Sequence, residues 1–140
     1  MIVMSKEVDG TRQSLVEVRR GLLRLHKALV DSERAAFEVG SGALSNGQFL
    51  QLLLQDPYFA WLRPYSTLIA EIDGALAADD GVDSEQARTF VRRVRELVSV
   101  TEVNTGADSR YHEVRSRDPD VLFAHAELAR RLKDAEAPIG

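Results

Sequence analysis

Two histidines and two carboxylates are the residues best placed by type and spacing to do chemistry. Each lies in a segment with helical periodicity and borders the apolar face of that segment, so we expect each to point towards a core. Imidazole and carboxylate groups from several helices can bind a divalent metal inside a helical bundle. The candidate ligands of such a mononuclear site are His26, Glu33, Asp73 and His125.

The same four residues could instead belong to a hydrogen-bonded network without a metal. A buried charge without a partner is expensive, and buried polar side chains usually find hydrogen-bond partners. In this interpretation His26 or Arg63 neutralises one of the two carboxylates. His125 then bonds to a backbone carbonyl or to water. The Glu-x-x-His motif of di-metal bundles is absent, so we predict no cofactor and keep a divalent metal as the alternative.

A cluster of aromatic residues surrounds one arginine in the middle of the chain. Four of the nine aromatic side chains fall within eight positions. Large rings can fill the corner between two helices, but Trp, Tyr and Arg also dominate the binding energy of protein interfaces. Both interpretations stay open, and the functional one makes the corner an interface or a ligand pocket. Its residues are Tyr58, Phe59, Trp61, Arg63 and Tyr65.

Arginines recur at helical spacing further along the chain, at Arg88, Arg92 and Arg95. Glu85 and Glu96 lie at ion-pairing distances in sequence, which favours a solvated face with salt bridges. A third functional hypothesis makes this stripe a binder of nucleic acid or of a phosphorylated partner, with steep salt dependence. The net charge of −4 argues against nucleic acid as a partner.

Known catalytic motifs are missing from the sequence. It has no cysteine, which excludes disulfides, thiolate nucleophiles and cysteine metal sites. Glycine-rich phosphate loops, Gly-x-Ser-x-Gly elbows and His-Glu-x-x-His pairs are also absent. Tyr111, His112 and Glu113 have acid–base side chains, but neighbours on a helix point in different directions, so we expect this segment on the surface. The sequence therefore favours a non-catalytic protein.

The composition is that of one globular domain. The 140 residues carry 44% hydrophobic and 29% charged side chains. The chain shows neither about twenty consecutive apolar residues nor a basic, apolar leader, so we expect a cytoplasmic protein without a membrane span. Fifteen arginines against three lysines fit a bacterial coding habit.

Hydrophobic periodicity predicts an all-α fold, an antiparallel bundle of about four main helices plus short helical segments. Gly21 lies within the first long helix and indicates that a neighbouring helix approaches closely there. We predict a single domain over residues 1–140, with 1–10 and 136–140 frayed. The predicted helices are 11–37, a short one after Ser45, one turn at 58–62, 64–78, a long one from Asp83 or Ser84, and 119–135.

Several local patterns make sharper predictions. After the capping box of Ser45 and Gln48, the apolar run 49–54 predicts a short, heavily buried helix. Aspartate before proline at 56–57 and 118–119 predicts two helix starts. Residues 98–103 alternate β-branched side chains, but no partner strand is evident, and we predict helix. The last helix is expected to bury Val121, Leu122, Leu128 and Leu132.

Two phrases in the first half of the chain resemble a group of small bacterial all-helical proteins. The first is residues 25–29 with 31–34. The second, at 56–64, reads Asp-Pro-Tyr-Phe-Ala-Trp-Leu-Arg-Pro and fits the pattern D-P-x-F-A-W-L-R-P. No activity is attached to that group, so the resemblance implies a helical bundle and leaves function open.

The leading hypothesis is a non-catalytic helical bundle that acts through self-association or through a protein partner. It would use a helix face near the aromatic corner. The apolar and aromatic content exceeds what the amphipathic stripes need, and such a surplus is typical of interfaces. We therefore predict a homo-oligomer or a protein partner and no membrane.

Overall fold

A computed structural model describes residues 2–99 and 107–136, and side chains within 10–99 and 110–135. This part of the chain is all-α and contains no strand, as the periodicity predicts. It forms six α-helices and one 3₁₀ helix. They are α1 (Ile2–Ser41), α2 (Asn46–Gln55), η1 (Pro57–Leu62), α3 (Arg63–Ala77), α4 (Ser84–Val98), α5 (Ala107–Arg117) and α6 (Pro119–Glu136).

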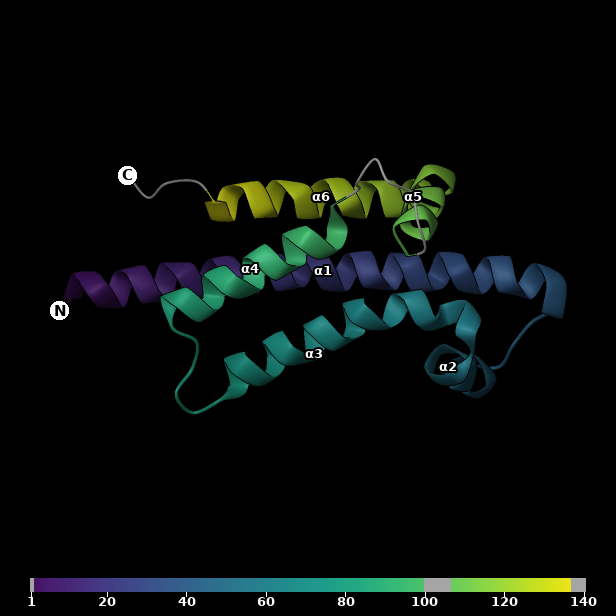
Figure 1. The fold of residues 1–140 in the computed structure, drawn as a ribbon, viewed down its shortest axis with the longest axis horizontal. Helices are drawn as coiled ribbons and strands as arrows, with labels where there is room; N and C mark the ends of the chain where they lie inside the picture. Colours follow the sequence, from purple (N-terminus) through teal and green to yellow (C-terminus); the bar gives the residue numbers. More distant parts are fainter. Residues whose placement is uncertain (1, 100–106, 137–140) are drawn as a thin grey trace.

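The 40-residue α1 is the axis of an antiparallel bundle (Figure 1). α3 and α6 run along it in the opposite direction, and α4 runs in the same direction. The short α2 and α5 both lie towards the C-terminal end of α1. No helix among the described residues combines the length and apolar character needed to cross a membrane.

The core grows from the predicted apolar stripe of α1. Its leucines and valines at three- and four-residue steps are fully buried, because they face the other three long helices. They are Leu15, Val18, Leu22, Leu25 and Leu29. The helix is longer than the predicted 11–37, since it begins at Ile2 and continues to Ser41. It ends before Gly42, whose φ of 84° an L side chain would resist.

Gly21 marks the close approach of α6 to α1, as predicted. A Cβ placed on it would lie 3.0 Å from Cδ1 of Leu128 and 3.4 Å from the Cα of that residue. The glycine therefore brings the two backbones nearer than any other residue type would allow without adjustment.

Side-chain caps start the helices where the sequence predicts. Ser45 and Gln48 form the capping box of α2, and Asp83 with Gln86 forms that of α4. Asp56 accepts from the amide of Tyr58 at the start of η1, which is a 3₁₀ turn. These bonds satisfy amides that the first turn of a helix leaves unpaired.

Three predictions about burial and helix ends need correction. α2 is not heavily buried: only Phe49 is, while Leu50 and Leu54 are 55% and 64% exposed. Leu122 of α6 is 50% exposed, and Ala124 is buried beside Val121 instead, because α6 turns a narrower stripe to the core than its apolar residues suggest. α4 ends at Val98, capped by Ser99, and residues 100–103 lie outside the described part.

Candidate functional site

The carboxylate of Glu33 is the centre of the most extensive polar network among the described residues. Its side chain is fully buried on α1. Arg110 of α5 donates to it twice, from Nε to Oε2 at 2.8 Å and from Nη2 to Oε1 at 3.0 Å. Arg117 donates to Oε1 at 3.1 Å, and the indole of Trp61 donates to Oε2 at 3.0 Å. Three elements, α1, η1 and α5, therefore meet at one charge.

Both arginines have further partners around that carboxylate. Arg110 donates to the hydroxyl of Tyr58 at 2.6 Å, and its guanidinium lies 5.0 Å from the centre of the Tyr58 ring. Arg117 also donates to Oγ of Ser32 at 3.1 Å. Hydrogen bonding to Glu33 raises the pKa of Arg110. Every direction from which Glu33 could accept a proton or a ligand is occupied by a donor, so it fits a structural role.

The aromatic corner points inward. Phe59 and Tyr65 are buried, and Tyr58 and Trp61 are half-buried with their polar atoms turned to the Glu33 network. Ring contacts continue through the corner, with Phe59 against Phe49 at 5.5 Å and Tyr65 stacked on Tyr111 at 6.1 Å. The rings fill space between elements, and that geometry favours the packing interpretation of the cluster.

Arg63, the arginine of that cluster, turns towards the start of η1. Its Nη2 donates to the backbone oxygen of Asp56 at 3.2 Å, and its buried Nε has no hydrogen-bond partner. The network hypothesis allowed Arg63 to neutralise Glu33 or Asp73, but Arg63 bonds to neither carboxylate.

The four candidate metal ligands do not converge. Glu33 is surrounded by hydrogen-bond donors. Asp73 forms an ion pair with Arg19 of α1, and both side chains are partly exposed. His26 is half-buried on α1, and burial lowers its pKa. Within the part of the chain that the structure describes, no three His, Cys, Asp or Glu side chains are grouped as metal ligands. The arrangement corresponds to separate polar contacts.

His125 bonds to two residues of α5. Its Nδ1 lies 2.5 Å from the hydroxyl of Tyr111, and its Nε2 lies 3.4 Å from Nη1 of Arg115. Because arginine only donates, Nε2 is the acceptor and the neutral ring carries its proton on Nδ1. Burial, and then the charge of Arg115, lowers the pKa of His125. The expected partner, a carbonyl or water, is thus replaced by side chains.

Tyr111 corrects the prediction of a surface segment at 111–113. His112 and Glu113 are exposed, but Tyr111 is buried, and that burial raises the pKa of its hydroxyl. The sequence did not assign Arg110, Arg115 and Arg117 to a site. One signal was available: a carboxylate predicted to be buried needs a cation, and this segment supplies three.

The three arginines of the predicted basic stripe on α4 do not all lie on one exposed face. Arg88 and Arg92 are exposed, and Arg95 is half-buried towards α5 and α6. Between them, Arg93 pairs with Glu71 of α3 at 2.5 Å. The hypothesis that this stripe binds nucleic acid or a phosphorylated partner stays a prediction.

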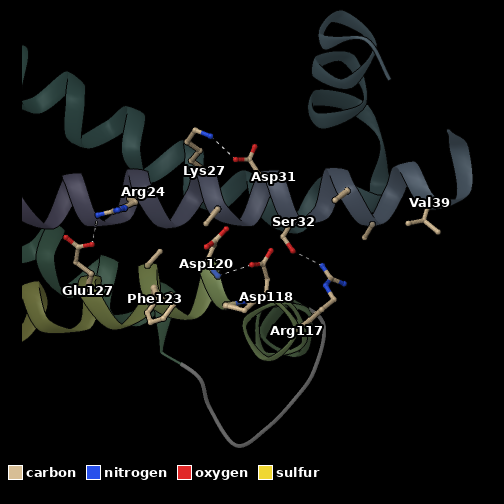
Figure 2. Close-up of a pocket in the computed structure, with 15 residues that line it drawn as sticks. Arg24, Lys27, Asp31, Ser32, Val39, Arg117, Asp118, Asp120, Phe123 and Glu127 are labelled. Atoms are coloured by element: carbon tan, nitrogen blue, oxygen red, sulfur yellow. Dashed lines mark hydrogen bonds and ion pairs between the residues drawn. The ribbon is translucent and has the colours of Figure 1, made fainter. Parts of the chain in front are cut away.

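A groove of about 1070 Å³ runs along the second half of α1, beside the start of α6 (Figure 2). Its lining on α1 includes the small residues Ala28, Ser32, Ala35 and Ala36. Phe123 and Val39 line it and are 72% and 88% exposed. At one end Arg24 bonds to Glu127 across the two helices, 2.8 Å apart. The groove is therefore an apolar channel with a charged rim.

Comparison with known proteins yields no match: no protein-family model, no curated protein and no solved structure is significantly similar to the chain. The resemblance around residues 56–64 therefore stays a prediction.

Proposed function

We propose that this bundle is a non-catalytic association module, and that α2 is the helix through which it contacts another protein chain. The observation that carries the proposal is the composition and exposure of α2. Its sequence, Asn-Gly-Gln-Phe-Leu-Gln-Leu-Leu-Leu-Gln, contains no charged residue. Leu50 and Leu54 lie one helical turn apart and are largely exposed. Exposed leucines without flanking charges are typical of helix faces that bind a partner.

α2 is held firmly enough to present those leucines. Phe49 packs edge-on against Phe59, and the guanidinium of Arg34 lies 4.7 Å from the centre of the Phe49 ring. Arg34 also donates to the backbone oxygen of Leu44 at 2.7 Å and to the side chain of Asn46 at 3.1 Å. A helix fixed in this way loses little conformational entropy on binding.

The partner we propose first is a second copy of the chain. A surface that carries charge of one sign repels its own copy, and α2 carries none, so two α2 helices can approach without electrostatic cost. Gly47 lies on the same side of the helix and faces open space, since a Cβ there would meet no atom within 4 Å. A leucine from a second α2 could approach the backbone closely there.

The test is the molar mass in solution as a function of concentration. Size-exclusion chromatography with light scattering on the wild type should show a mass that rises with concentration. The variant Leu50→Glu/Leu54→Glu should stay monomeric. Leu122→Glu is the control, since it places one negative charge on an exposed leucine of α6, and each single variant of Leu50 and Leu54 is compared with it. A monomeric wild type from micromolar to millimolar concentration contradicts self-association.

The groove at Phe123 is the second candidate face for the same function. Phe123 and Val39 are the most exposed of the large apolar residues described, and both line the groove. The variant Val39→Glu/Phe123→Glu distinguishes the two faces. If it abolishes association while the α2 variant does not, the groove replaces α2 as the contact face.

A bacterial and cytoplasmic setting stays part of the proposal on the strength of the sequence alone, because no feature of the fold bears on it.

A further inference from the structure

A second, smaller cleft lies at the other side of α5, between α5, the end of α4 and α6. Its volume is about 290 Å³, near the lower end of small-molecule pockets. Its polar lining comprises Ser99, His125 and three arginine or lysine side chains. Of these three, Arg95 has an interaction of its own, so the cations open to a ligand are Arg115 and Lys133. Val98 and Leu132 are buried and form an apolar floor. No acidic residue is among the described residues that line it.

The charge of Arg115 is not compensated within the described part of the chain. Its two hydrogen bonds go to imidazoles, from Nη1 to Nε2 of His125 at 3.4 Å and from Nη2 to Nδ1 of His112 at 3.2 Å. Arg110 and Arg117 on the same helix are both paired with Glu33. A half-buried guanidinium without a carboxylate favours binding of an anion.

This concentration of positive charge is unusual for the chain as a whole. The protein has a net charge of −4, and several of its other arginines are paired with carboxylates, as Arg24 is with Glu127 and Arg131 with Glu17. The cleft is therefore a local anion-attracting point on an acidic protein, where association is steered by the local field.

We propose that this cleft binds a small monocarboxylate with a short apolar chain. The carboxylate accepts hydrogen bonds from Arg115 and Lys133, and the apolar chain covers Val98 and Leu132. A compact dianion such as phosphate satisfies the cations but leaves the floor in contact with water, so the apolar floor selects the carboxylate. This site is separate from α2 and does not depend on association of the protein.

Binding is measured by isothermal titration calorimetry of the full chain with sodium butyrate, sodium acetate and sodium phosphate at one ionic strength. Butyrate should bind about tenfold more tightly than acetate, because each additional buried methylene strengthens the apolar contact. Phosphate should bind no better than acetate.

Arg115→Gln/Lys133→Gln should weaken butyrate binding at least tenfold. The control, Arg12→Gln/Arg20→Gln, removes the same charge from exposed positions of α1 and should leave the affinity unchanged. Lys133→Glu, at an exposed position, repeats the test with a variant that does not alter the contacts of Arg115 with the two histidines.

The imidazole signals of His125 locate the ligand by nuclear magnetic resonance. His125 faces Tyr111 and Arg115 of α5 and shares the cleft with Arg95 of α4 and Lys133 of α6. A carboxylate beside Arg115 offsets the positive charge that the imidazolium meets, so butyrate should raise the pKa of His125.

Equal affinities for all three anions would overturn the apolar part of the proposal. Butyrate binding that survives both cleft variants, or that leaves the His125 signals unmoved, would place the ligand elsewhere and overturn the site.

Discussion

Arg110 donates a hydrogen bond to each carboxylate oxygen of Glu33 from two nitrogens of its guanidinium, although the two residues lie 77 positions apart in sequence. The pair joins α5 to α1 in a region where α5 makes few other contacts with that helix. A bidentate pair of this kind fixes orientation as well as distance. The pair therefore fixes α5 on α1, while Tyr111 and Arg115 hold α5 to His125 of α6.

Replacing that carboxylate should destabilise the fold strongly. Glu33→Gln leaves Arg110 and Arg117 facing a neutral amide that also cannot accept from both of them and from Trp61. Removing one partner of a buried ion pair costs about 3 kcal/mol or more, and we expect the free energy of unfolding, measured in urea, to fall by about 3 kcal/mol because both arginines still reach solvent.

The matched control is Glu113→Gln, which removes the exposed carboxylate 3.4 Å from Arg110. An exposed pair contributes at most about 1 kcal/mol. Equal losses for the two variants would contradict the central role of Glu33.

Two glycines in helices should respond differently to alanine. Alanine is favoured over glycine inside a helix by about 0.5–1 kcal/mol, and a Cβ on Gly74 of α3 meets no atom within 4 Å. Gly74→Ala should therefore raise the unfolding free energy by about that amount. In Gly21→Ala the contact of the new Cβ with Leu128 should cancel the gain in helix propensity. Gly21→Val should lower the unfolding free energy by about 1–3 kcal/mol through overpacking. Thermal unfolding of the three variants checks the order, which a stabilising Gly21→Val would reverse.

Stability should decrease as the pH falls through the range where histidine titrates. The pKa values of His26 and His125 are both lowered from 6.5 in the folded protein. The unfolded chain therefore binds more protons below about pH 7, and the unfolding free energy decreases from there towards the lowered folded pKa values. Urea denaturation at a series of pH values measures the slope.

The histidine substitutions identify the source of that slope. His26→Gln/His125→Gln should flatten it, whereas His112→Gln, at an exposed residue, should leave it in place. A slope that persists in the double variant would assign the pH dependence to other groups.

Loss of the Phe49 ring should release α2 while the long helices stay folded. The ring is buried against Phe59 and Arg34, and Phe→Ala in a core costs about 3–5 kcal/mol. In Phe49→Ala, hydrogen exchange should accelerate in α2 and remain slow in α1 and α6. Leu54→Ala, at an exposed position of the same helix, should leave exchange in α2 within the wild-type range. Uniform acceleration along the chain would show that α2 is not a separate unit.

The sequence predicted those parts of the fold that local patterns determine. The stripe from Leu15 to Leu29 follows from helical periodicity, and the caps at Ser45, Asp56 and Asp83 follow from side chains that bond within three residues. The close approach at Gly21 was also readable, because an isolated glycine in a helix needs a packing reason.

The parts that the sequence could not predict depend on contacts between distant segments. In α2, leucines occur on every side, so periodicity alone does not show that Phe49 faces the core and Leu50 the solvent. The pairing of Glu33 with Arg110 and Arg117 requires α5 to cross α1 at one point, and no local pattern sets that crossing. The cleft of Arg115 and Lys133 likewise appears only when α4, α5 and α6 are brought together.

The packing of α6 on α1 also determines when the protein can fold during synthesis. These helices lie near opposite ends of the chain, and the bonds between them join residues 103 and 114 positions apart. Closing so long a loop is entropically costly, and α1 cannot bury its stripe fully until residues 119–136 have left the ribosome. Until then part of the apolar stripe of α1 stays exposed on the nascent chain, and exposed apolar segments of this kind are where chaperones bind.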